Sequence, residues 1–282
     1  ININSVWLII LLFIAAAICI LTSIVLGGLQ GIKHFEDYGK INMIMPIFKL
    51  LGTIFFIIIG LDLYGVFFSI TIGYAVMLLF GWNILKKYFL TAEMKRSNIK
   101  LIDILKFGIG SFIVNAGISF FTNIDVVIVK HYFPSQLTGL YSSAAVLAKM
   151  ILYVSTSIVV TLFPTVVASK KTNDSGKILF KSLFYGGGIS LITAIGLVIL
   201  KKPMILVLYG FEYINSVDYI WMLCLMIVIL SLLSIIANFR LAMGHIKSLS
   251  LSIILGIILT IILTAIFHKT IYSIINIMSF VM

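Results

Sequence analysis

Eight apolar stretches, each long enough to cross a lipid bilayer as a helix, follow one another through the 282 residues. They cover residues 5–27, 42–60, 63–85, 104–131, 138–165, 178–200, 217–243 and 247–268. Because lipid offers no partner for an open backbone group, stretches of this kind are predicted to be helical. A ninth stretch, residues 272–282, is too short to cross alone. The sequence therefore predicts an all-α, polytopic membrane helix bundle with about eight full transmembrane helices and a short C-terminal helix.

The scarcity of charge excludes a soluble catalytic domain. Only 10% of the residues are charged and 62% are hydrophobic, whereas a typical soluble domain is about 25% charged. The sequence has no glycine-rich phosphate-binding motif and no Cys/His cluster with metal-ligand spacing. We therefore expect a chain that is not an enzyme and that holds neither a cofactor nor a metal ion.

The basic residues alternate between the predicted connections. Fourteen Lys and Arg residues fall in or near the connections around residues 28–41, 86–106, 170–181 and 240–247, and four fall in the others. Because basic connections stay in the cytoplasm, this asymmetry places the four richer ones there. It also explains most of the net charge of +11 without nucleic acid as a partner. We expect a multi-pass protein of a bacterial cytoplasmic (plasma) membrane.

The most charged connection, residues 86–103, is predicted to link two bundles. Residues 1–97 would form a partial N-terminal lobe with three transmembrane helices, and residues 98–282 a C-terminal lobe with five to six. Because the chain begins with an apolar stretch rather than with Met, we expect it to be a piece of a longer protein. The Gly186–Gly188 run is expected to loosen its helix locally.

A polar stripe is predicted on the helix at residues 138–165. Lys149 lies well inside this stretch and shares a helix face with Ser142, Tyr153 and Thr156. Charged groups inside a membrane usually face a polar cavity or a partner. Lys149 is therefore either part of a substrate pathway or a structural lysine with a single partner.

Asp125 is the one carboxylate well inside a predicted span, and Asn115 lies on the same helix. Reflection through the turn near Pro134 places Asp125 opposite residue 145, so that Lys149 is only about 6 Å deeper on the neighbouring helix. Asp125 could thus pair with Lys149, bond to neighbouring backbone groups, or couple a cation or proton.

Lys49 is the second intramembrane lysine. Pro46, one turn earlier, is expected to kink its helix. Lys49 could bind an anion in a cavity, or extend to the cytoplasmic interface. Two lysines against one aspartate leave a net positive interior, which favours an anionic substrate such as a diphosphate.

Several short segments resemble the polysaccharide branch of the multidrug/oligosaccharidyl-lipid/polysaccharide flippase superfamily. The segments are residues 123–129 (NIDVVIV), 139–145 (GLYSSAA), 162–164 (LFP), 208–210 (LYG) and 28–31 (GLQG). The resemblance implies two lobes around a central cavity and transport by alternating access. The substrate would be an undecaprenyl-diphosphate-linked oligosaccharide repeat unit for a surface polysaccharide such as O-antigen or capsule. About three N-terminal helices of the family pattern would be missing.

On that resemblance, Lys149 and Lys49 are candidates to contact the diphosphate, with Ser142, Tyr153, Thr156 and Asn115 lining the cavity. Asp125 would position Lys149 or couple a cation. The expected partners are the lipid-linked oligosaccharide, membrane lipids, and a polysaccharide polymerase with its chain-length machinery. The alternatives are a cation-coupled multidrug antiporter of the same superfamily and a membrane polysaccharide polymerase or glycosyltransferase.

Overall fold

The computed structural model describes residues 6–91, 101–169 and 175–282, and these residues are almost entirely helical. They contain eight helices, some of them interrupted, that are long and apolar enough to cross a membrane. The predicted all-α membrane bundle is therefore confirmed. The chain divides into two compact units, residues 1–98 and 99–282, which are considered separately. The middle of the expected linker, residues 92–100, lies outside the described residues.

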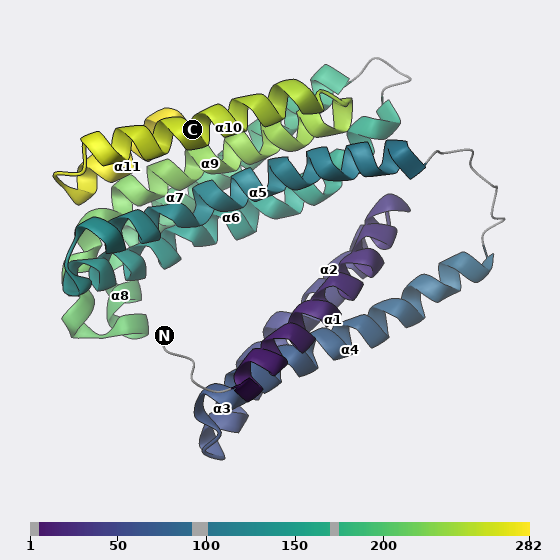
Figure 1. Cartoon of the computed structure of the whole chain (residues 1–282), viewed down its shortest axis with the longest axis horizontal. Helices are drawn as coiled ribbons and strands as arrows, with labels where there is room; N and C mark the ends of the chain where they lie inside the picture. Colours follow the sequence, from purple (N-terminus) through teal and green to yellow (C-terminus); the bar gives the residue numbers. More distant parts are fainter. Residues whose placement is uncertain (1–5, 92–100, 170–174) are drawn as a thin grey trace. The chain divides into compact units, whose positions relative to one another are not determined.

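The described residues of unit 1 form four helices (Figure 1), which are α1 (Val6–Gly31), α2 (Phe35–Asn42), α3 (Ile44–Ile58) and α4 (Asp62–Thr91). Both α1 and α3 pack against α4. Small residues allow the close approach, because a Cβ at Gly28 would lie 3.0 Å from the Leu85 side chain. The helix expected at residues 42–60 corresponds to α3, and a break at Met43 separates α3 from α2 before it. This break agrees with the kink expected from Pro46, whose ring crowds the carbonyl four residues earlier.

Unit 2 contains the remaining helices. They are α5 (Leu101–Tyr132), α6 (Ser135–Ser169), α7 (Ser175–Ile199), α8 (Lys201–Tyr209), the 3₁₀ helix η1 (Phe211–Ser216), α9 (Val217–Met243), α10 (Ile246–Ile266) and α11 (Ile271–Val281). Helix α9 is the central element, because it contacts α5, α6, α7, α10 and α11. Figure 1 shows α9 running between α10 and the α6–α7 pair. Its buried residues include Leu223, Met226 and Leu230, which are inaccessible to solvent.

The glycine run at residues 186–188 does not interrupt its helix, contrary to the expected loosening. Helix α7 continues through all three residues. A Cβ on Gly186 would clash with the side chain of Ile235 on α9. The absence of a side chain therefore brings α7 close to the central helix, which is a packing role typical of small residues in membrane bundles. The short helices α8 and η1 were not anticipated from the sequence.

Two glycines on α5 offer a matched test of this packing. A Cβ at Gly117 would clash with Ile253 on α10, whereas a Cβ at Gly108 would meet no atom within 4 Å. Substitution by Ala at either glycine gains about 1 kcal/mol of helix propensity. At Gly117 alone, the added methyl group also overpacks the contact with Ile253, which costs about 1–3 kcal/mol. We expect Gly117→Ala to lower the thermal midpoint of the detergent-purified protein and Gly108→Ala to leave it unchanged or raise it. Equal midpoints for the two variants would contradict the α5–α10 contact.

Candidate functional site

The site is built on the hairpin of α5 and α6, whose register follows from a tight turn. Helix α5 ends at Tyr132, and α6 begins at Ser135 after Pro134. The amide of Phe133 still donates to the carbonyl of Val129 at 2.9 Å, so the chain reverses with almost no extra length. Antiparallel pairing about this turn brings Asp125 of α5 level with the first half of α6. The turn residues therefore determine which side chains meet inside the membrane.

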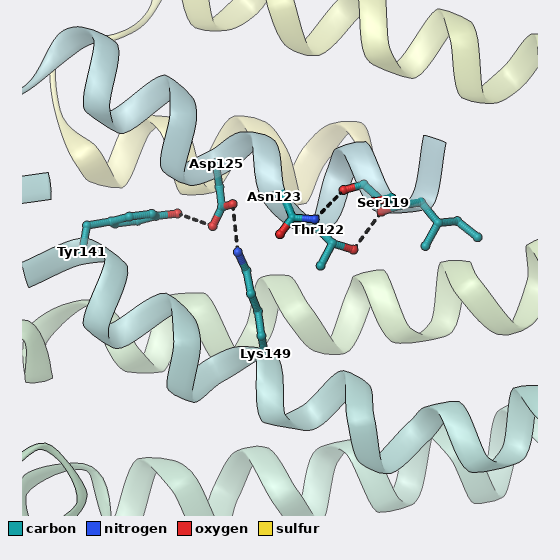
Figure 2. Close-up of polar contacts among 7 residues, drawn as sticks. Ser119, Thr122, Asn123, Asp125, Tyr141 and Lys149 are labelled. Atoms are coloured by element: carbon teal, nitrogen blue, oxygen red, sulfur yellow. Dashed lines mark hydrogen bonds and ion pairs between the residues drawn. The ribbon is translucent and has the colours of Figure 1, made fainter. Parts of the chain in front are cut away.

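Asp125 is completely buried and has a partner on each carboxylate oxygen (Figure 2). The Lys149 ammonium lies 3.3 Å from Oδ1, and the Tyr141 hydroxyl donates to Oδ2 at 3.1 Å. The ion pair anticipated from the sequence is thus present. We call these three residues the Asp125 cluster. Its side chains come from two helices, so the cluster also fixes the depth at which α5 and α6 contact each other.

The members of the Asp125 cluster differ in exposure, and that difference is chemically important. Asp125 and Tyr141 are both fully buried, whereas the side chain of Lys149 retains 15% of its accessible surface. A buried carboxylate without a partner would be very costly, and the pair with Lys149 removes most of that cost. Lys149 is therefore the most accessible member of the cluster; it contacts Asp125, which in turn accepts the hydrogen bond from Tyr141.

Tyr141 is a functional candidate that the sequence reasoning missed. It was recognised only as part of the GLYSSAA segment. The hairpin register contained the necessary signal, because Tyr141 and Lys149 lie four residues to either side of position 145, which faces Asp125. A long polar side chain at either position can reach the carboxylate. The same reflection that predicted the lysine therefore also favours the tyrosine.

The polar residues of α5 form a row beside the cluster, and most of them bond to their own helix. Asn115 donates to the Ser111 carbonyl at 2.8 Å, and Asn123 donates to the Ser119 carbonyl at 2.9 Å. Figure 2 shows Thr122 and Asn123 on the turn next to Asp125. Asn115, Ser119 and Asn123 are exposed on the surface of unit 2. One amide N–H of each of these two asparagines is therefore used within α5.

The residues of the polar stripe expected on α6 do not all lie close to the Asp125 cluster. Ser142 is half-buried and donates to the Gly139 carbonyl at 3.0 Å, whereas Thr156 donates to the Tyr153 carbonyl at 2.7 Å. Tyr153 is 76% exposed, and Thr156 is also exposed. Neither of these two residues contacts the Asp125 cluster through a described hydrogen bond. Their assignment to a cavity wall stays a prediction.

Lys49 belongs to unit 1 and has no place in the Asp125 cluster. It is exposed on α3, and it forms no ion pair with any residue that the structure describes. Nearby, Thr53 shares a hydrogen bond of 2.8 Å with Ser69 of α4. Anion binding by Lys49 and its extension to the cytoplasmic interface both stay predictions. In the described ranges no group of three or more His, Cys, Asp or Glu residues could hold a metal ion.

A family model described as polysaccharide biosynthesis protein matches residues 2–170. The match covers more than half of the chain, including unit 1 and the hairpin that carries the Asp125 cluster. The chain belongs to the polysaccharide biosynthesis protein family. The resemblance to the polysaccharide branch of the flippase superfamily is thereby confirmed. No curated protein and no solved structure matches the chain significantly.

Membership in the polysaccharide biosynthesis protein family sets the functional context. The protein takes part in polysaccharide biosynthesis as a multi-pass membrane protein, and family members are typically transporters rather than enzymes. The family also implies a lipid-linked oligosaccharide as the substrate context. The Asp125 cluster therefore lies in a multi-pass membrane protein of polysaccharide biosynthesis.

A double-mutant cycle tests whether the cluster is energetically coupled. Lys149→Gln leaves a fully buried carboxylate with Tyr141 as its remaining described side-chain partner, so we expect a loss of about 3 kcal/mol in the free energy of unfolding. Asp125→Asn should also destabilise, because it leaves Lys149 without a counter-charge. The neutral pair Asp125→Asn/Lys149→Gln should recover at least half of the combined loss.

The measurement is reversible unfolding of the purified protein in mixed micelles. Lys49→Gln is the matched control, because it removes the same charge from an exposed lysine without a described ion pair, and it should change the stability by less than about 1 kcal/mol. Strictly additive losses in the double variant would show that Asp125 and Lys149 are not coupled.

Proposed function

We propose that this protein flips undecaprenyl-diphosphate-linked oligosaccharide repeat units across a bacterial cytoplasmic membrane for surface polysaccharide synthesis. The single observation that carries the proposal is an amine inside an apolar span, Lys149, within a chain of the polysaccharide biosynthesis protein family. The flipped repeat unit would then be available to a polymerase and its chain-length machinery. No covalent chemistry is required.

The physical problem in such transport is the charge of the diphosphate. Moving an anion through hydrocarbon is prohibitive unless a cation neutralises it and water or polar groups replace its hydration. A lysine supplies a compact positive charge on a flexible stem, and charge-assisted hydrogen bonds to phosphate oxygens are strong. Lys149, with part of its surface accessible and polar residues of α5 beside it, has these properties.

The Asp125 cluster explains how such an amine could release its ligand again. Without substrate, Asp125 neutralises Lys149 across 3.3 Å. When a diphosphate arrives, Lys149 rotates toward it and leaves Asp125 with the Tyr141 hydrogen bond. Departure of the diphosphate lets Lys149 return to its internal counter-ion. The ligand is thus bound by exchange of one anion for another, which keeps its affinity moderate and reversible.

The transport cycle would be alternating access, with rocking of two lobes around the substrate. Support comes from the division of the chain into two compact units at residue 98, close to the lobe boundary expected at residue 97.

Neither alternative function has an observation in its favour. A multidrug antiporter needs a carboxylate open to organic cations, whereas Asp125 is fully buried and held by two donors. A polymerase or glycosyltransferase needs clustered acidic or basic groups on a sizeable extramembrane loop. The described connections on the lysine-poor side are short, apart from α8 and η1.

Complementation of cells that lack the gene tests the proposed role of Lys149. We expect Lys149→Gln to reduce surface polysaccharide at least about tenfold, and Lys149→Arg to retain most of it, because a positive charge is the requirement. The double variant Asp125→Asn/Lys149→Gln should be stable but remain inactive. Surface polysaccharide is quantified per amount of protein in the membrane.

Lys130→Gln is the matched control, since Lys130 is exposed at the end of α5 where the chain turns into α6. It should support normal polysaccharide levels. Normal levels with Lys149→Gln would overturn the assignment of this lysine. Recovery of activity in the neutral double variant would show that Lys149 serves stability alone.

A further inference from the structure

A second group of basic residues surrounds a cavity in unit 2, at the end opposite the α5–α6 turn. The cavity has a volume of about 790 Å³ and lies between the beginning of α5 and the α9–α10 connection. It is lined by Lys106, Phe107, Ile109, His245, Ile246 and Lys247, among others. All of these residues lie in the second unit, residues 99–282.

Two glycines create this arrangement. Gly244 ends α9 with a left-handed backbone (φ +88°), a conformation that favours glycine, and the chain reverses at once into α10. Gly110 then allows α5 to approach Ile246 so closely that any Cβ would clash. Lys106, one turn before Gly110, and Lys247, directly after Ile246, are thereby brought to the same level. The two amines come from different helices but border one cavity.

The described part of the cavity lining is basic. Within the described residues Lys106, His245 and Lys247 form no ion pair, and none of the described lining residues is acidic. The His245 side chain does not cap α10. The positive end of that helix therefore adds to the charge of the two lysines. The lining consequently attracts an anion.

The apolar residues of the cavity lining favour an anion that also carries an apolar part. Phe107, Ile109 and Ile246 provide an apolar wall next to the basic rim, and Phe107 and Ile109 are exposed. The cavity opens at the lysine-rich end of the helices, which the charge asymmetry places at the cytoplasmic headgroup level. An inorganic anion would use the rim alone, whereas a lipid phosphate with its acyl chains would use both surfaces.

We propose that this cavity binds the phosphate headgroup of an anionic phospholipid from the cytoplasmic leaflet. The phosphate lies between Lys106 and Lys247, with His245 at its side, and the acyl chains follow the apolar wall. Basic pockets between transmembrane helices on the cytoplasmic side are suited to such headgroups. The site is separate from the Asp125 cluster, and the proposal does not depend on the transport function.

Lipid retention on the purified full chain tests the proposal. The protein is incubated with detergent-solubilised phosphatidylglycerol or phosphatidylcholine, and bound lipid is measured by native mass spectrometry. We expect preferential retention of phosphatidylglycerol, and a reduction of roughly tenfold in Lys106→Gln/Lys247→Gln. The matched control is Lys130→Gln/Lys269→Gln, which removes two exposed lysines, one at the other end of α5 and one in the connection after α10, and should leave retention unchanged.

Three results would overturn the proposal. The first is equal retention of phosphatidylglycerol by the parent and the Lys106→Gln/Lys247→Gln variant. The second is an equal loss in the control variant, which would indicate a general effect of charge. The third is displacement of phosphatidylglycerol by millimolar inorganic phosphate, which would identify a site for the free anion. Because no readout involves transport, failure here leaves the proposed function unaffected, and loss of transport would not affect this site.

Discussion

The contact between Asp125 and Lys149 is the interaction on which the interpretation of this protein depends. A carboxylate with no accessible surface in an apolar span is tolerable only if its charge and lone pairs are satisfied. Lys149 supplies the charge and Tyr141 supplies a second hydrogen bond. Such a cluster contributes little net stability compared with apolar packing. We therefore propose that the cluster is present in a span in order to handle an anion rather than to stabilise the fold.

The remainder of unit 2 provides a rigid frame for that cluster. Helix α9 contacts most of the other helices, and glycines such as Gly117 and Gly186 let neighbouring helices approach closely. Because lipid is as apolar as leucine, close packing rather than burial from water holds such helices together.

Local chemistry explains which features were predictable. The apolar stretches fixed the number of spans, and the turn near Pro134 fixed the register from which the Asp125–Lys149 pair was inferred. Tyr141 was missed because tyrosine is unremarkable in an apolar helix until its register is considered. The effect of Gly186–Gly188 was predicted wrongly, because glycine serves both a flexible helix and a close helix–helix contact. The position of Ile235 beside Gly186 shows that close packing is its role here. Helices α8 and η1 are short elements within one connection, and the apolar stretches that locate the spans do not mark them.

The most direct test of the flippase proposal is the location of the lipid-linked oligosaccharide in cells that lack the gene. Membrane lipids would be extracted and analysed by mass spectrometry, after treatment of intact spheroplasts with a glycosidase that cannot cross the membrane. Flippase function predicts that undecaprenyl-diphosphate-linked repeat units accumulate and are protected from the enzyme, since they remain in the cytoplasmic leaflet. An unchanged lipid pool, or repeat units fully accessible from outside, would contradict it.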